Sequence, residues 1–161
     1  MSVILDGSVA LAWCFEDEAT AEIDTILDHI AEHGAHVPSI WRLEVANGLQ
    51  SAIRRKRIDA AYRDLALSRL MTQRVTVDTE TDRHAWSTTV RLAERYGLTI
   101  YDASYLELAL RLDLPLATAD KLLIAAAQSA GLPPLELWAA KDAMREPQRR
   151  SGCFEHWLNQ R

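Results

Sequence analysis

The chain alternates short apolar runs with longer stretches of helical periodicity, and this alternation limits its fold more than any other feature. Runs typical of buried strands lie at 2–6, 35–39, 74–78 and 114–118, with a fifth candidate at 135–138. Helical patterns cover about 18–33, 40–53, 59–72, 82–96, 103–112 and 121–130. Strands separated by helices predict parallel βαβ units. We therefore expect a three-layer α/β/α sandwich around a mostly parallel sheet of four or five strands.

The length of 161 residues suits one domain with its own hydrophobic core. We predict that this domain spans residues 1–138. The remaining segment, 139–161, has no clear period and no assigned element. Two interpretations of it stay open, a docking arm and a disordered tail.

Composition and cysteine content favour a cytoplasmic protein. Hydrophobic residues make up 48% and charged residues 25% of the chain, as is ordinary for a globular domain. No apolar run has the length of a membrane span, and Asp6 interrupts the apolar start, which argues against a signal peptide. Cys14 and Cys153 lack metal-ligand spacing and suggest a reducing compartment.

The charge balance gives a mixed indication about nucleic acid. The net charge of −5 argues mildly against a protein that binds nucleic acid by bulk electrostatics alone. However, the segment "IRRKR" at 53–57 places four cations in a row. A solvated helix end explains such a run equally simply, because cations are favoured at helix C-termini.

Four acidic residues occur where predicted strands end or helices begin. Asp6 follows the first strand, and Asp120 lies two residues beyond the run "LPLAT". Asp102 opens the helix after "LTIY", and Glu44 lies on the helix after the second strand, with Asn47 on the same face. Parallel sheets bind ligands at the carboxyl ends of their strands, so these four groups are expected to converge there.

Each acidic residue also has a simpler explanation. Asp102 and Asp120 precede helices, where Asp is a preferred N-cap, and Asp6 could end a strand or cap the next turn. Glu44 lies on a helix that reads as largely buried, where it needs a cation or a partner such as Arg42 or Arg54. Capping explains each position singly but not why all four fall at one end of one sheet.

A cluster of carboxylates without a nearby Lys or Arg suits a hard cation, because Mg²⁺ and Mn²⁺ prefer oxygen ligands. Mg²⁺ uses few protein carboxylates together with waters and substrate phosphates, which points to phosphodiester chemistry. Four carboxylates in one cleft also repel one another. At least one of them is therefore expected to have a folded-state pKa above its unfolded value.

Four segments of the sequence carry a family resemblance. "VILDGSVALAW", "VPSIWRLEVANGL", "LTIYDASYLELAL" and "LPLATADKLL" resemble, in order and spacing, the signature segments of PIN domains. Within that superfamily they most resemble the VapC-type toxins of toxin–antitoxin pairs. The resemblance covers about residues 1–138 and leaves the C-terminal segment unmatched.

The resemblance implies a parallel α/β/α sandwich and an Mg²⁺- or Mn²⁺-dependent endoribonuclease. Carried over by position, the catalytic and metal-binding quartet is Asp6, Glu44, Asp102 and Asp120, with Asp6 and Asp102 as the direct metal ligands. The supporting polar residues are Ser8, Asn47 and Thr118. Gly7 departs from the family pattern, which usually has a residue with a small side chain there, and this should loosen the turn after Asp6 slightly.

The resemblance also implies partners. The expected ones are an RNA substrate, a VapB-type antitoxin and a second copy of the chain in a homodimer. The expected reaction is metal-assisted hydrolysis of RNA, with Glu44 or Asp120 positioning the attacking water. A housekeeping or DNA-directed PIN nuclease and a non-catalytic PIN-fold binding module remain as alternatives.

Other candidate sites are weaker. His29 and His33 are spaced i, i+4, but "HIAEH" lacks the Glu position of a metalloprotease helix, so a zinc site is not expected. Three tryptophans, Trp13, Trp41 and Trp86, lie on predicted helical faces and are expected in the core.

Overall fold

The computed structural model describes residues 1–133 and 135, and its centre is a four-stranded parallel sheet. The strands are β1 (Val3–Leu5), β2 (Ala35–Val37), β3 (Val75–Val77) and β4 (Leu116–Ala117), in the order β3-β2-β1-β4. In the register, Ile4 pairs with His36 on one side and Leu116 on the other. Residue 135 is not in a strand, and the rest of the predicted fifth strand and the segment 139–161 lie outside the described residues.

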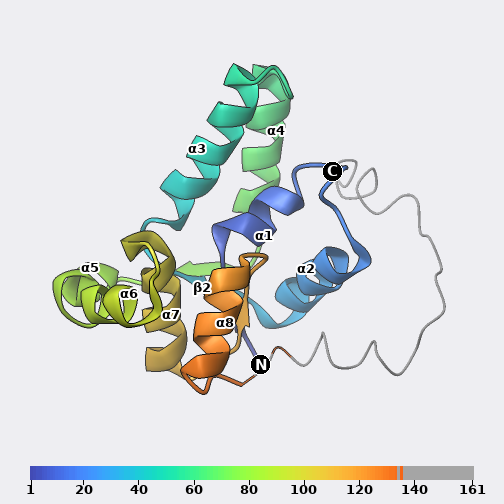
Figure 1. Ribbon diagram of the computed structural model, residues 1–161. Coiled ribbons are helices and arrows are strands. Elements are labelled where there is room, and N and C mark those ends of the chain that lie inside the picture. The colour runs from blue at the N-terminus through green and yellow to red at the C-terminus, as the bar shows by residue number, and fades with distance from the viewer. Residues whose placement is uncertain (134, 136–161) are drawn as a thin grey trace.

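Helices occupy every connection of this sheet, as the alternating pattern predicts (Figure 1). They are α1 (Gly7–Ala12), α2 (Ala21–His33), α3 (Trp41–Arg54), α4 (Ala60–Met71), α5 (Thr81–His84), the π-helical segment η1 (Ala85–Thr89), α6 (Val90–Tyr96), α7 (Ile100–Leu112) and α8 (Lys121–Ser129). Helices α3 and α4 form a hairpin that extends away from the sheet (Figure 1). None of the helices in the described ranges is long and apolar enough to cross a membrane.

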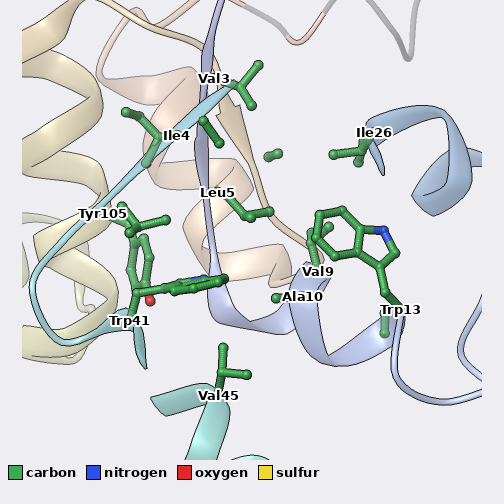
Figure 2. Packing of buried hydrophobic residues seen from close by; sticks show 14 of the residues in the cluster. Val3, Ile4, Leu5, Val9, Ala10, Trp13, Ile26, Trp41, Val45 and Tyr105 are labelled. Carbon is green, nitrogen blue, oxygen red and sulfur yellow. The ribbon is translucent and has the colours of Figure 1, made fainter. Parts of the chain in front are cut away.

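The core is built around β1, whose three residues are completely buried. Figure 2 shows Ile26 of α2 and Tyr105 of α7 on opposite sides of this strand. A strand covered on both faces must be apolar throughout, which explains the continuous run "VIL" rather than an alternating pattern. The α/β sandwich predicted from the sequence is therefore confirmed.

The strand order creates a crevice next to β1. The chain moves outward in one direction from β1 to β2 to β3 and then returns to place β4 on the other side of β1. Parallel sheets bind ligands at such a switch point, outside the carboxyl ends of the strands. Here those ends carry Asp6 after β1 and Thr118 after β4.

The long helix predicted over 82–96 is interrupted, and Trp86 is not in the core. The segment consists of α5, η1 and α6, and Gly97 ends it with a left-handed conformation (φ 65°). Trp13 and Trp41 are buried as expected, but Trp86 is 96% exposed. The π-helical segment changes the angular spacing of side chains, so the regular helical stripe used for the prediction does not hold there.

An ion network fastens α7 to the end of β3. Arg111 donates from Nε to Glu107 Oε1 (2.9 Å) and from Nη2 to Asp78 Oδ2 (2.9 Å). The Glu107 and Asp78 side chains are only 5% and 10% exposed. Burial alone would raise the pKa of Asp78, but hydrogen bonds from Arg111 and Thr81 outweigh it and hold that pKa below its ordinary value. The network therefore fixes the helix that carries Asp102.

Candidate metal and phosphodiester site

The four predicted carboxylates line one cleft of about 320 Å³ at the carboxyl edge of the sheet. They come from four separate elements: the end of β1, helix α3, the first turn of α7 and the start of α8. The residues that line it are Asp6, Gly7, Ser8, Leu11, Glu44, Asn47, Gly48, Asp102 and Asp120. The fold thus brings together residues separated by more than a hundred positions in the chain, and no Lys or Arg in the described ranges lines the cleft.

Helices α1 and α3 pack closely beside this cleft at Gly48. A Cβ atom at Gly48 would lie only 2.5 Å from Leu11 Cδ1, so a larger residue at 48 would force the Leu11 side chain to move. At Gly7, in contrast, a Cβ would meet Tyr105, Glu44 and Val45 at ordinary distances of 3.6–3.9 Å. An Ala in the position of Gly7 would therefore fit, and Gly7 is not required by close packing.

Asp6 lies at the bottom of the cleft and is held by two hydroxyl groups. Its Oδ2 atom accepts hydrogen bonds from Ser8 Oγ (2.5 Å) and Thr118 Oγ1 (2.7 Å). The same two side chains accept hydrogen bonds from the backbone of the β4–α8 connection: Ala119 N donates to Ser8 and Asp120 N to Thr118. Asp6 makes no side-chain cap for α1, so the capping alternative does not explain it.

Asp102 and Asp120 differ in how they relate to helix capping. Thr99, not Asp102, is the N-cap of α7, and its hydroxyl group donates a hydrogen bond to Asp102 Oδ2 (2.6 Å). Helix α7 therefore begins at Ile100, earlier than the predicted 103. Asp120 is the N-cap of α8, with Oδ1 accepting from Leu122 N (2.7 Å) and Leu123 N (3.0 Å). Asp120 thus caps a helix and lines the cleft at once.

Glu44 is held by a residue to which the sequence analysis gave no role. The hydroxyl group of Tyr105, on α7, donates a short hydrogen bond to Glu44 Oε2. The sequence offers Arg42 and Arg54 as partners, but Tyr105 is the residue that binds Glu44, and Arg54 instead donates to Ser51. Helix α3 is also less buried than the sequence predicts, since Leu43 is 74% exposed. Tyr105 follows Asp102 by three positions, so it lies on the same face of α7. That spacing is the signal that could have identified it.

Burial and mutual repulsion affect the electrostatics of the cleft. Burial raises the pKa of Asp6, opposed by the bonds from Ser8 and Thr118, and the charge of Asp102 raises it further. The pKa of Glu44 is also raised, again mainly by burial, and hydrogen bonding to Tyr105 opposes the shift. The expectation of a raised pKa in the cluster is met, but burial contributes more than repulsion between carboxylates.

The residues of the cleft fit a hard divalent cation. The polar side-chain atoms that line the cleft are all oxygen apart from the Asn47 amide nitrogen, and oxygen is the ligand that such cations prefer. A cation would also offset the free-energy cost of the buried Asp6 charge. Within the described ranges, no three His, Cys, Asp or Glu side chains are placed so that they could hold a metal ion by themselves. Mg²⁺ commonly completes its coordination shell with water or substrate oxygens, which suits a cleft of this kind. Direct contacts from all four stay a prediction of the sequence.

The raised pKa of Asp6 predicts a pH-dependent stability of the metal-free protein. For an acid with a raised folded-state pKa, stability falls as pH rises from the unfolded value of 3.8 until the folded pKa is passed. In EDTA, Asp6→Asn should therefore melt above the wild type at pH 7.5, and this advantage should shrink toward pH 4.

Metal should reverse this order. Millimolar Mn²⁺ is expected to stabilise the wild type, by about 2.7 kcal/mol when its concentration is a hundred times Kd, and so to raise its melting temperature. The melting temperature of Asp6→Asn should stay nearly unchanged. Asp28→Asn, at an exposed position on α2, is the matched control. Equal melting of Asp6→Asn and wild type in EDTA, with equal Mn²⁺ shifts, would refute the clustered site.

Comparisons with known proteins agree with this architecture. Residues 3–129 match the family model of the PIN domain. The chain is 34% identical over 121 residues to VapC ribonuclease Mb0985 of Mycobacterium bovis and to Ribonuclease VapC9 of Mycobacterium tuberculosis, covering 73% of this chain and 85% of each relative. The crystal structure of PAE2754 from Pyrobaculum aerophilum superimposes with a TM-score of 0.63 at 26% identity, covering 90% of this chain and 97% of that one.

The family match spans β1 to α8 and therefore includes every element that contributes to the cleft. The two mycobacterial relatives exceed 30% identity over most of their length. The chain therefore belongs to the PIN-domain family and, within it, to the VapC type.

Proposed function

We propose that the protein is a divalent-metal-dependent endoribonuclease, the toxin of a type II toxin–antitoxin pair that cleaves cellular RNA in the cytoplasm. The single observation that supports this most strongly is the cleft in which four carboxylates from four elements meet. The names of the mycobacterial relatives, both ribonucleases, support RNA as the substrate class.

The residues of the chain divide the work of such a site between them. Asp6 and Asp102 would hold the cation, with Ser8 and Thr118 fixing the orientation of the Asp6 carboxylate. A bound Mg²⁺ or Mn²⁺ would supply Lewis-acid polarisation of the phosphate and a lower pKa for nearby water. Its charge would also invert the sign of the acidic cleft, which explains how a chain of net charge −5 can accept RNA there.

Glu44 is the residue best placed to orient a water molecule for attack. Its carboxylate lines the cleft, and the bond from Tyr105 restricts its orientation. Burial raises the pKa of the Tyr105 hydroxyl group far above its ordinary range, so this group remains a donor at any physiological pH. Asp120 is oriented by the backbone of α8 and is the second candidate for this role.

A cleavage assay tests the proposed activity. Purified protein should cut single-stranded or structured RNA when Mg²⁺ or Mn²⁺ is present and should stop when EDTA is added. A DNA of the same sequence is the matched comparison, because a DNA-directed PIN nuclease would prefer it. Absence of RNA cutting at every metal concentration would favour a binding module and contradict the proposal.

A VapB-type antitoxin is the proposed regulator. An Arg or Lys of such a partner could enter the cleft and pair with the carboxylates, displacing the cation through charge-assisted hydrogen bonds. In that case excess metal should weaken inhibition. This competition can be measured by titrating the purified partner at several Mn²⁺ concentrations.

A homodimer is also proposed, and the surface around η1 supports it. Trp86 is 96% exposed, and Val90, one turn further along, is 41% exposed. Contiguous apolar patches commonly mark interaction surfaces, and these two neighbouring side chains are the basis on which we assign the dimer contact to this face. Light scattering should report a dimer at micromolar concentration, and Trp86→Glu should shift it to monomer while Arg91→Glu, at an exposed neighbouring position, should not. A wild-type monomer would refute the dimer.

A further inference from the structure

One face of α3 leads from the cleft to the tip of the α3–α4 hairpin. Glu44, Asn47, Ser51 and Arg54 follow one another at spacings of three or four residues, so their side chains share this face. Glu44 and Asn47 line the cleft. Arg54 lies ten residues beyond Glu44, about 15 Å along the helix axis. The hairpin extends away from the sheet (Figure 1), and on this face Asn47 and Arg54 are exposed while Glu44 and Ser51 are half-buried.

Arg54 is tied to that face by a neutral partner. Its Nη2 atom donates a hydrogen bond to Ser51 Oγ (2.9 Å), and no carboxylate in the described ranges neutralises its charge. Arg55 and Lys56, which follow it, are exposed and also form no ion pair among the described residues. Three adjacent cations are therefore available to a ligand.

The fourth cation of the run, Arg57, has a structural role and differs in this respect from Arg54. Arg57 pairs with Glu18 (2.7 Å) and Asp17 and stacks over the Phe15 ring (3.8 Å). The helix dipole explains the presence of cations at the end of α3. It does not explain why Arg57 is neutralised while Arg54 is held, without a carboxylate, on the face that leads to the cleft.

We propose that Arg54, oriented by Ser51 and assisted by Arg55 and Lys56, binds phosphates of the RNA strand a few nucleotides from the scissile bond. This inference rests on the proposed function and specifies where the substrate lies. The carboxylates of the cleft repel RNA phosphates wherever no cation neutralises them. Affinity for the RNA must therefore come from positive charges beside the cleft. A guanidinium group presents a planar fork that matches a phosphate. Asn47 offers an amide on the same face of α3, between Glu44 and Arg54.

The test is RNA binding in EDTA, where no cutting is expected. A labelled single-stranded RNA of mixed sequence is titrated by fluorescence anisotropy with wild type, Arg54→Gln and the matched control Arg74→Gln. Arg74 immediately precedes β3 and therefore lies at the amino ends of the strands, whereas the cleft lies at their carboxyl ends. Arg54→Gln should bind about three- to tenfold more weakly and lower the slope of log K against log salt by about 0.7. Arg74→Gln should match the wild type.

Two further measurements distinguish a phosphate contact from a structural role. In the cleavage assay, Arg54→Gln should raise KM with kcat unchanged, and Arg54→Lys should recover part of the loss because the charge remains. With RNAs shortened stepwise from each end, the Arg54→Gln penalty should vanish once the strand no longer reaches the hairpin tip. Ser51→Ala should give a smaller KM increase.

The failures of the two proposals are distinguishable. If the wild type cuts and binds RNA but Arg54→Gln shows the same Kd and salt slope, Arg54 does not bind the RNA and the nuclease proposal stands. If Arg54→Gln leaves RNA binding intact but weakens an acidic protein partner, the surface is a protein interface and the inference is overturned. If the wild type neither binds nor cuts RNA, both proposals fail together.

Discussion

Asp6→Asn and Asp102→Asn are each expected to reduce RNA cleavage by at least about a hundredfold, since loss of groups that merely support metal ligands already costs 10–100-fold. Asp6 is the most buried carboxylate of the cleft and has two dedicated hydroxyl donors. An Asn side chain keeps one oxygen for those donors and removes the charge that would hold the cation. Initial rates in Mn²⁺ with a defined RNA are the measurement.

The variants must remain folded for this result to count. Each should retain the wild-type circular dichroism spectrum, and Asp28→Asn should cut like the wild type because Asp28 lies on the exposed side of α2. Near-wild-type turnover by a folded Asp6→Asn or Asp102→Asn protein would show that the cleft does not carry the reaction.

The second large effect concerns stability. Arg111→Met is expected to destabilise the fold by about 3 kcal/mol, because it leaves Asp78 buried without its cation and Glu107 with only His84, at 3.5 Å, beside it. Arg83→Met is the matched control, since the Arg83–Glu80 pair is largely exposed and should contribute less than about 1 kcal/mol. Urea unfolding at pH 7.5 measures both changes.

The pH dependence of this loss has a definite sign. The pKa of Asp78 is held low in the folded state, so the stability it contributes is present above the unfolded value of 3.8 and is lost as pH falls through the folded pKa. The gap between wild type and Arg111→Met should therefore be largest near neutrality and narrow below about pH 4. If the stability difference between wild type and Arg111→Met were the same near neutrality and below about pH 4, the network would not act through charge.

The fold and the positions of the carboxylates could be predicted because they depend on local patterns. The strand β1 reads directly as an apolar run, and Asp6 follows it. Parallel strands place their carboxyl ends at one edge, so the convergence of Asp6 and Asp120 needs only the sheet topology. Helix capping and a position in the cleft are also compatible, because Asp120 caps α8 and lines the cleft at the same time.

Contacts between distant side chains could not be predicted in the same way. The bond between Tyr105 and Glu44 spans 61 positions, and the one between Arg111 and Asp78 spans 33. The spacing of Asp102 and Tyr105 places Tyr105 on the same face of α7, but its pairing with Glu44 depends on how α7 packs against α3. The pairing of Arg111 with Asp78 likewise depends on how α7 packs against the end of β3. A regular helical period predicts Trp86 in the core, but the π-helical segment breaks that period and Trp86 is exposed. The roles of segment 139–161 stay a prediction.

Metal binding and RNA cutting followed in the same samples test the central claim most directly. Protein stripped with EDTA is titrated with Mn²⁺, and bound metal and initial cleavage rate are measured at each step for wild type, Asp6→Asn and Asp28→Asn. The account predicts that cutting rises with occupancy in wild type and Asp28→Asn, whereas Asp6→Asn neither binds Mn²⁺ in this range nor cuts. Cutting by metal-free wild type, or Mn²⁺ binding and turnover by Asp6→Asn equal to those of the wild type, would contradict it.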